Sequence, residues 1–484
     1  MSRRHLASAV IATCSVLLLA ACSTTLQGKA VSVFDDPFSV AGMPATDGPS
    51  GLRDNPAGPS RVVLNTDDGE IDELARQAVS DIEEFWSGVY SDTFDGEFVP
   101  VEALISWDAN GFDGEFCGDD TYGLVNAAFC YDDETIGWDR GELLPALRDA
   151  NGEMGVAMVL AHEYGHAIQR KAGLTRKSTP TLVAEQQADC FAGSYMRWVA
   201  EDKSPRFTLN TGDGLNNVLA AVIAFRDPVL NEGDPEAGFD EHGSAFERLS
   251  AFQFGFTDGP SACASIDMRE IDQRRGDLPV LLPEDPTGEI QTGEMSITEE
   301  SVRSMTDVMG VLFKPAKPPK LSFDTKLECP DARPSPPASY CPATNTIVVD
   351  MDELQAMGAQ ADLVDGGGLA SGDNTAYSVL ISRYMQAIQH ERGGLVLDNA
   401  QAALRTACLT GVATTKMSSD VSIPNGDTLE LSAGDLDEAV SGILENGLVA
   451  SDVNGETVPA GFSRIDAFRV GVLGDMDGCV KRFP

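Results

Sequence analysis

Apolar side chains recur at helical spacing near the start of the folded part of the chain. Leu74, Ala78, Ile82 and Phe85 follow one another at intervals of three or four residues, with polar and acidic side chains between them. This spacing places the four apolar side chains on one face and predicts an amphipathic helix over residues 71–86.

Strand and helix patterns then alternate along the first half of the chain. Residues 98–105 are rich in Val, Phe and Ile and predict a strand-rich stretch. A long helix is expected to end near Gly173, and the next helix is expected to open with Thr179 as its N-cap and Pro180 at its first position. A further amphipathic helix is predicted over residues 245–254.

The second half of the chain repeats sequence words of the first half in the same order. Residues 159–169 recur as residues 379–389, and residues 248–255 recur as residues 464–471. The offset between matching positions stays nearly constant, which is typical of an internal repeat and not of scattered chance matches. We therefore expect a second copy of the same fold after the first.

Composition and pattern together predict five segments: a signal peptide at residues 1–21, a flexible tether at 22–68, a first domain at 69–265, a linker at 266–295 and a repeat domain at 296–484. The tether and the linker are predicted because both stretches are rich in Pro, Gly and acidic residues and lack periodicity. The resulting fold class is α+β and helix-rich, with a degenerate repeat.

The motif His162-Glu163-Tyr164-Gly165-His166 lies in the first of two neighbouring predicted helices. Two histidines four residues apart project from the same face of a helix, so both imidazoles can hold one metal ion. Glu163 lies next to the first histidine and could accept a proton from a metal-bound water. The motif is therefore typical of a zinc site with an adjacent general base.

Glu185 and Asp189 are four residues apart on the next helix and complete the candidate site. Glu185 follows His166 at a distance that lets one helix end and the next one return toward it. Two histidines and one glutamate form a catalytic type of zinc site, because the fourth position stays open for water. Asp189 could accept a hydrogen bond from the far ring nitrogen of a ligand histidine and fix its tautomer.

These two motifs resemble those of the bacterial "putative neutral zinc metallopeptidase" family, a gluzincin-type group. The resemblance covers about residues 70–263. It implies a zincin-like fold, one Zn²⁺ ion with His162, His166 and Glu185 as ligands, and hydrolysis of peptide bonds in a peptide or protein substrate. Three shorter words also match the family: Cys117-Gly118, Phe129-Cys130 and His242-Gly243-Ser244.

Two functions remain open for His242. It could donate a hydrogen bond to the oxyanion that develops during peptide hydrolysis, which would make it a catalytic residue beside the glutamate base. Alternatively, it only fixes the Gly243-Ser244 turn or caps the helix that follows. Tyr164 is not expected to take part, because its counterpart Tyr384 occurs in the second copy, which has no metal motif.

The second copy lacks the metal-binding residues. Ser382, Arg383 and Gln386 stand where the first copy has the motif's two histidines and glutamate, and Ala403 and Ala407 replace the two acids of the next helix. Hydroxyl and amide groups are poor zinc ligands. We therefore expect a metal-free structural or binding domain, which could hold an unknown protein partner.

The chain carries a formal net charge of −42, and 42% of its residues are hydrophobic. This hydrophobic content is that of a folded protein. Such an acidic surface repels phosphate backbones, which argues against nucleic acid as a partner. We interpret the acidity as a source of solubility outside the cell.

The N-terminus predicts export and lipid anchoring. Arg3-Arg4 precede an apolar run over residues 6–21 that ends in small residues, which is typical of a signal peptide. The end of this run together with Cys22 resembles a bacterial lipobox. This resemblance implies that Cys22 carries a lipid and anchors the protein to the extracytoplasmic face of the cell membrane. An ordinary secretory signal with an unmodified Cys22 is the alternative.

Eight further cysteines remain once those of the signal peptide and the lipid site are set aside, and export favours disulfide bonds between them. Because the cysteines match between the two copies, we expect pairing within each copy; buried free thiols are the alternative. The expected pairs are Cys117–Cys130, Cys190–Cys263, Cys329–Cys341 and Cys408–Cys479.

The function predicted from these features is that of a zinc-dependent peptidase at the outer cell surface. One alternative is a non-catalytic, lipid-anchored binding or structural lipoprotein stabilised by zinc, although a structural zinc site does not need a base such as Glu163. A second alternative is a cell-surface binding module in which the second copy holds a partner and the first copy modulates it.

Overall fold

The computed structural model describes the chain from residue 36 to residue 484, apart from residues 112–113, 233, 235–241, 284–291 and 361–367. The signal peptide expected at residues 1–21 and the lipid-bearing Cys22 lie outside the described residues. In the part of the chain that the structure describes, no helix is both long and apolar enough to cross a membrane.

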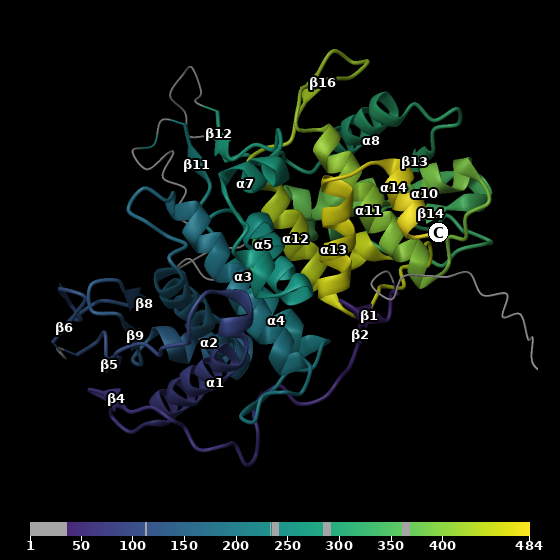
Figure 1. Cartoon of the computed structure of the whole chain (residues 1–484). Helices are drawn as coiled ribbons and strands as arrows, with labels where there is room; N and C mark the ends of the chain where they lie inside the picture. Colours follow the sequence, from purple (N-terminus) through teal and green to yellow (C-terminus); the bar gives the residue numbers. More distant parts are fainter. Residues whose placement is uncertain (1–35, 112–113, 233, 235–241, 284–291, 361–367) are drawn as a thin grey trace, which may run out of the picture.

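A four-stranded sheet lies at one end of the first half (Figure 1). Its strands, in order across the sheet, are β4 (Val63–Leu64), β5 (Leu104–Trp107), β9 (Thr135–Asp139) and β8 (Ala127–Cys130). The edge strand β8 is antiparallel to β9, whereas the other neighbours are parallel. The strand predicted over residues 98–105 is confirmed only at its end, where β5 begins.

Helices form most of the first half. The first predicted helix, over residues 71–86, is confirmed as part of a longer helix, and so is the one predicted over residues 245–254. The long second helix is interrupted at Gly152, whose φ is 72°, and its end at Gly173 is confirmed. The helices are α1 (Glu70–Thr93), α2 (Leu143–Ala172), α3 (Thr181–Ala200), α4 (Asp213–Ala224) and α5 (Ala245–Asp258).

The start of α3 differs slightly from the prediction. Thr179 was expected to cap the helix, but its hydroxyl accepts a hydrogen bond from the backbone nitrogen of Arg176 at 2.9 Å and closes the preceding turn. Pro180 therefore occupies the N-cap position, and the helix begins at Thr181.

The second half has a similar order of elements, with an antiparallel strand pair followed by helices. Its principal elements are β14 (Ala338–Cys341), β15 (Thr346–Val349), α10 (Asp373–Arg392), α11 (Ala400–Lys416), α12 (Asp435–Glu445) and α13 (Gly461–Val472). In each half one pair of helices packs very closely. A Cβ on Gly193 of α3 would lie 2.1 Å from the carbonyl oxygen of Phe252, and one on Gly411 of α11 would lie 2.2 Å from that of Phe468. The degenerate repeat itself stays a prediction.

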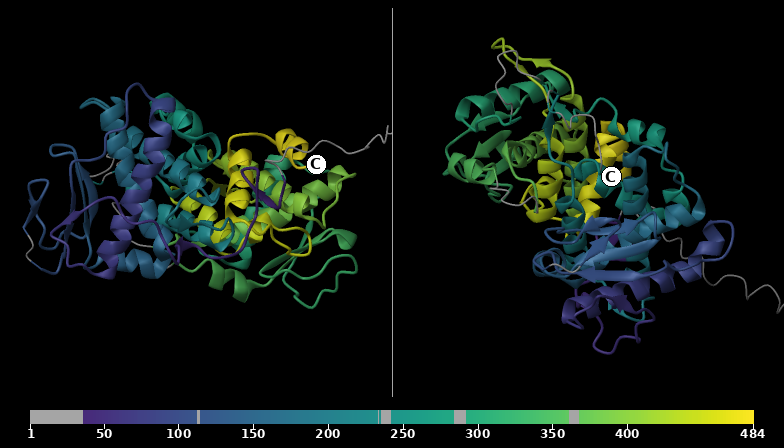
Figure 2. Two further views of the ribbon diagram at one scale, coloured as in Figure 1. Left: turned by 60° about the horizontal axis from the view of Figure 1, so that its bottom comes forward. Right: turned by 90° about the vertical axis from the view of Figure 1, so that its left-hand side faces the viewer.

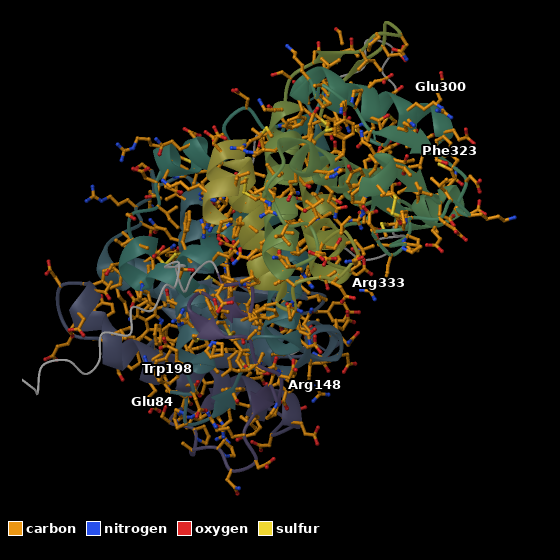
Figure 3. All side chains as sticks on the ribbon, turned by 90° about the vertical axis from the view of Figure 1, so that its right-hand side faces the viewer. Glu84, Arg148, Trp198, Glu300, Phe323 and Arg333 are labelled. Carbon is orange, nitrogen blue, oxygen red and sulfur yellow. A yellow bond between two sulfur atoms is a disulfide. The ribbon has the colours of Figure 1, made fainter. Side chains whose placement is uncertain are left out.

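The described parts of the two halves share one hydrophobic core. The helices α12 and α13 pack against α4 and α5, which Figure 2 shows as yellow ribbons beside teal ones. Polar contacts join them as well: the side chain of Gln253 donates to the carbonyl oxygen of Phe462 at 3.1 Å. Charged side chains such as Arg148 of the first half and Arg333 of the second remain at the surface (Figure 3).

The prediction of a flexible tether over residues 22–68 is wrong for residues 36–68. Within this stretch β3 (Gly51–Leu52) pairs with β10 (Phe207–Thr208), and Val40 is completely buried. The Pro- and Gly-rich composition therefore reflects an irregular path across the surface of the domain and not a detached segment.

The prediction of a linker over residues 266–295 is wrong for its first part. The helix α7 (Met268–Arg275) packs on α5. Arg275 pairs with Glu247 of α5 at 2.9 Å, and Arg274 donates to the side chain of Gln186 on α3. The charged residues that suggested a solvated linker are instead bonded to the first half.

Disulfide bonds join the eight cysteines in the pairs expected from the sequence. The bonds are Cys117–Cys130, Cys190–Cys263, Cys329–Cys341 and Cys408–Cys479. In each half, the first bond closes a short loop next to an edge strand. The second bond ties a helix, α3 in the first half and α11 in the second, to the end of that half.

Candidate metal centre

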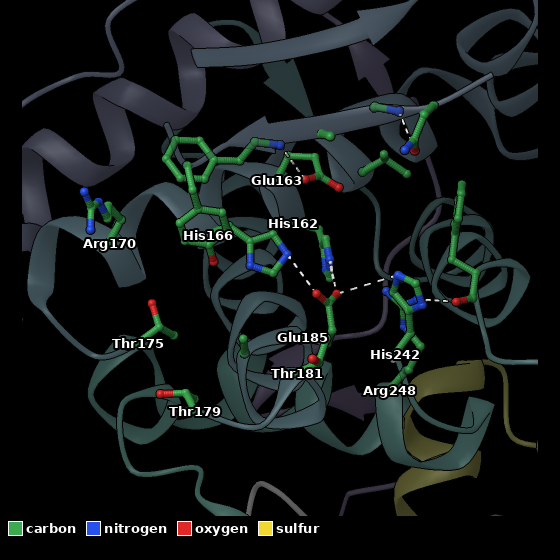
Figure 4. Close-up of a pocket in the computed structure, with 18 of the residues that line it drawn as sticks. His162, Glu163, His166, Arg170, Thr175, Thr179, Thr181, Glu185, His242 and Arg248 are labelled. Carbon is green, nitrogen blue, oxygen red and sulfur yellow. Dashed lines mark hydrogen bonds and ion pairs between the residues drawn. The ribbon is translucent and has the colours of Figure 1, made fainter. Parts of the chain in front are cut away.

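Three side chains from two neighbouring helices meet in one place (Figure 4). The helix α2 presents His162 and His166, and α3 presents Glu185. The Nε2 atom of His162 lies 3.1 Å from Oε2 of Glu185, and Nε2 of His166 lies 3.3 Å from Oε1. The helices can approach this closely because Gly165 faces Ala188: a Cβ on this glycine would lie 2.8 Å from the Cα of the alanine.

This arrangement fits a zinc ion. Zinc binds histidine nitrogen and carboxylate oxygen at about 2.0–2.2 Å, so neighbouring ligand atoms of a tetrahedral site lie about 3.3 Å apart. The two nitrogen-to-oxygen distances of 3.1 and 3.3 Å agree with that separation. The donor set of two imidazoles and one carboxylate is also that of a catalytic zinc site with an open fourth position.

Hydrogen bonds behind the two imidazoles turn their Nε2 atoms toward the ion site. The Nδ1 atom of His162 lies 2.8 Å from Oδ1 of Asp189, as predicted, and Nδ1 of His166 lies 3.1 Å from Oε1 of Gln169. The side-chain N–H of Gln169 donates a hydrogen bond to the carbonyl oxygen of Ala184, so the side-chain oxygen must face the imidazole. In a zinc-bound site both rings would therefore carry the proton on Nδ1 and direct the Nε2 lone pair at the ion.

Replacing Gln169 by Leu is expected to weaken zinc binding by about 10- to 100-fold, because the His166 ring loses the partner that orients it. Competition with a chelator of known affinity measures the change. The matched control is Gln389→Leu, which removes an equally buried glutamine of α10 and is expected to leave zinc affinity unchanged. Equal affinities for Gln169→Leu and the wild-type protein would contradict the prediction.

Asp189 is itself held by a buried arginine that the sequence analysis did not recognise as part of the site. Arg248 of α5 donates to both oxygens of Asp189, at 2.9 Å from Nε and 2.7 Å from Nη2. Burial alone would raise the pKa of Asp189, but the charges of Arg248 and His162 hold it below its ordinary value. A single arginine among the apolar residues of a buried helix face was the signal that could have revealed this pair.

Glu163 occupies the position expected of a base beside the ion site. Its Oε2 atom accepts a hydrogen bond from the backbone nitrogen of Phe129 in β8 at 3.0 Å. Burial raises the pKa of the Glu163 carboxyl, an effect that the nearby imidazoles of His162 and His166 oppose. The edge strand thus fixes this carboxylate next to the first histidine.

His242 also faces the site, and a carboxylate orients it. Its Nδ1 atom lies 3.1 Å from Oδ1 of Asp227, whereas its Nε2 atom lies 3.9 Å from Oε2 of Glu185. The other oxygen of Asp227 accepts hydrogen bonds from the backbone nitrogens of His242 and Gly243 at 2.9 and 2.7 Å. The turn is therefore fixed by Asp227, which the sequence analysis missed, while the outer ring nitrogen points toward the ion site.

A carboxylate of the second half of the chain also reaches this region. Asp437 of α12 accepts a hydrogen bond from the backbone nitrogen of Phe246 at 3.3 Å, in the first turn of α5. It also lies 3.9 Å from Arg226, the neighbour of Asp227. The helix that carries Arg248 and follows His242 is therefore supported from the second half.

The corresponding positions of the second half form hydrogen bonds and no metal set. The guanidinium group of Arg383 is completely buried and donates to the carbonyl oxygen of Ala338 at 2.7 Å and the hydroxyl of Ser451 at 2.8 Å. Gln386 donates to the carbonyl oxygen of Asp452 at 3.0 Å. The side chains at these positions therefore bind backbone and hydroxyl groups inside the second half.

The ion site lies in a cleft of about 660 Å³. Residues 126–129, from the edge strand β8 and the residue before it, form one wall, and the loop between α2 and α3 forms another. Glu163 and His242 both line this cleft, together with the two histidines and Glu185. The three candidate ligands therefore border an open cleft.

Comparison with known proteins agrees with this geometry. The model of the "putative neutral zinc metallopeptidase" family matches residues 34–266. The "Uncharacterized protein YpfJ" of Escherichia coli (strain K12) is 30% identical over 131 residues, which are 24% of this chain and 44% of that protein. The "Uncharacterized protein Rv2575" of Mycobacterium tuberculosis (strain ATCC 25618 / H37Rv) is 25% identical over 169 residues, which are 30% of this chain and 57% of that protein.

The chain thus spans about half of the length of these curated relatives. No solved structure matches the chain. The family match includes the ligand helices, the edge strand, the His242 turn and residues 36–68, which pack across the domain surface. The segment over residues 34–266, slightly less than half of the chain, thus matches the putative neutral zinc metallopeptidase family, and its motifs and its ion site agree with that match.

Proposed function

We propose that this protein is a zinc-dependent peptidase that hydrolyses peptide bonds of a peptide or protein substrate. The observation that carries the proposal is the convergence of His162, His166 and Glu185 beside a carboxylate, Glu163, in the wall of an open cleft. A structural zinc site is normally closed by four protein ligands and needs neither an adjacent base nor access from solvent.

The residues of the cleft suit this reaction. A zinc ion held by the three ligands would activate a water molecule and polarise the carbonyl group of the peptide bond. Glu163 would accept the proton of the attacking water and pass it to the leaving amine. His242, oriented by Asp227, would donate a hydrogen bond from Nε2 to the oxyanion when it is protonated there.

The edge strand β8 offers a place for the substrate backbone. Residues 127–129 line the cleft, and among the described strands β8 has a neighbour only on the side of β9. The outward-facing backbone groups of such a strand can pair with an extended peptide. An extended substrate would then pass the ion site beside Glu163.

Removal of the metal tests the proposal. The purified protein is expected to contain one zinc ion per chain, to cleave members of a mixed peptide library, to lose this activity after dialysis against a chelator, and to regain it with added zinc. Mass spectrometry of the library measures the cleavage. Cleavage that survives complete removal of metal would contradict the proposal, and zinc without any cleavage would favour the non-catalytic lipoprotein.

We also propose that the protein works at the outer cell surface, held by a lipid on Cys22. The support is the N-terminal sequence pattern alone. Mass spectrometry of the N-terminal peptide from membrane fractions tests it. A cysteine that carries no lipid would show that the protein is secreted in soluble form or anchored in another way.

A further inference from the structure

The cleft differs in charge from the rest of the protein. The chain has 76 acidic and only 34 basic residues. In contrast, Arg170, Arg176 and Lys177 line the cleft near the loop between α2 and α3, and Asp132 is the one carboxylate among the described lining residues apart from Glu163 and Glu185. Apart from the ion site and its base, the three cations therefore face one carboxylate, which is a local excess of positive charge in a strongly acidic protein.

These cations lie beside the ion site because of the helices that carry them. Arg170 follows the ligand His166 by one helical turn and so projects from the same face of α2. Arg176 and Lys177 belong to the loop that joins the two ligand helices. Figure 4 shows Arg170 on one side of the ion site and His242 on the other, beside Arg248, which Asp189 binds; we call the Arg170 side the cationic end of the cleft.

The cations at this end are available to a ligand. The Nε atom of Arg170 lies 3.6 Å from Oε1 of Glu134, but Lys171 lies closer to the same carboxylate, at 3.2 Å, and 53% of the Arg170 side chain is exposed. Arg176 and Lys177 are exposed and form no ion pair with any residue that the structure describes. The fourth basic lining residue, Arg248, is different, because Asp189 already binds it.

Polar hydroxyl groups continue this surface toward the ion site. Thr175 and Thr179 of the same loop and Thr181 at the start of α3 also line the cleft, and Figure 4 shows Thr181 beside Glu185. Hydroxyl and guanidinium or ammonium donors together suit a carboxylate, which accepts several hydrogen bonds and carries the opposite charge. Because net charge −42 repels acidic molecules elsewhere, such a local cationic end can determine which acidic segments are accepted.

We infer that the peptidase selects substrates with a carboxylate close to the cleaved bond, on the side that enters the cleft at Arg170, Arg176 and Lys177. The inference rests on the proposed function and names its substrate class: peptides with an Asp or Glu side chain within a few residues of the cleaved bond. A free C-terminal carboxylate is the other source of the same chemistry.

Charge-matched peptides test this selectivity. A peptide that the wild-type protein cleaves is chosen from the library, with both ends blocked, and is prepared with Asp, Asn or Lys at each of the three residues on either side of the cleaved bond. At one or more of these positions, kcat/KM for the Asp version is expected to exceed that for the Lys version by about tenfold, since each exposed ion pair contributes only a few-fold. Comparing a free with an amidated C-terminus distinguishes the two sources of carboxylate.

Reversal of the loop charges provides the decisive variant. In R176E/K177E the order is expected to invert, so that the Lys version becomes the better substrate. The matched control R148E/R333E changes net charge by the same amount at two surface arginines outside the cleft, one half-buried and one exposed, and is expected to keep the wild-type order of the three versions. Unchanged zinc content shows that both proteins are folded.

The outcomes separate this inference from the proposed function. Equal kcat/KM for the Asp, Asn and Lys versions, or the same order in R176E/K177E and the control, would overturn the selectivity but leave the peptidase intact. A zinc-loaded wild-type protein that cleaves no member of the library would overturn both. The inference is supported if the order of kcat/KM for the Asp and Lys versions inverts in R176E/K177E but not in the control.

Discussion

Replacement of Glu163 by Gln is expected to lower kcat for peptide cleavage by about 10²- to 10⁴-fold, while the protein keeps its zinc. Glutamine has nearly the same shape but cannot accept the proton of the attacking water. The ligands His162, His166 and Glu185 are untouched, so metal content measured by atomic absorption should equal that of the wild type. Steady-state kinetics on a library-derived peptide measures the loss.

The control for this variant is Glu84→Gln, the same chemical change at an exposed residue that pairs with Arg206 (Figure 3). It is expected to retain wild-type kcat. If Glu163→Gln cleaved the peptide at the wild-type rate with zinc bound, Glu163 would not be the base. If it lost zinc, the residue would serve the ion site in a structural way.

Replacement of Arg248 by Met is expected to lower the free energy of unfolding by about 3–5 kcal/mol, which is the usual consequence of removing one partner of a buried ion pair. Asp189 is completely buried and Arg248 is 2% exposed, so no solvent can take the place of the lost guanidinium. Among the described residues, the carboxylate would keep only His162 as a side-chain partner. Urea denaturation of the zinc-saturated protein measures the change.

Two further variants sharpen this test. Arg303→Met removes the ion pair between Arg303 and Glu299, whose side chains are 56% and 60% exposed. It is expected to lower the free energy of unfolding by less than about 1 kcal/mol. The double variant D189N/R248M should be less destabilised than the sum of its single changes, because neither charge is left alone. A loss below about 1 kcal/mol for Arg248→Met would show that the pair is not important for stability.

Local spacing was sufficient to predict which residues of the candidate metal centre share a helix face. His162 and His166 are four residues apart, as are Glu185 and Asp189, and helical geometry repeats every 3.6 residues. The directions of side chains within one helix therefore follow from the sequence alone. The helix over residues 71–86 could be predicted for the same reason.

Composition was a poorer guide to which segments pack on the domain. Residues 36–68 and 268–275 are rich in polar, Gly or Pro residues, and both were assigned to a tether or a linker. In the structure they pair with strands or bind charged residues of the first half. Polarity shows that a segment can be solvated, but it does not show whether ion pairs and hydrogen bonds within the protein take the place of water.

The residues that orient the site became visible only in three dimensions. Asp227 holds His242 from 15 positions away, Arg248 binds Asp189 across 59 positions, and Asp437 supports α5 across 191 positions. No short-range pattern connects such partners. Helix periodicity sets which way a ligand points along its own helix, whereas the groups behind that ligand depend on how whole helices pack, and packing brings together residues that are far apart in the chain.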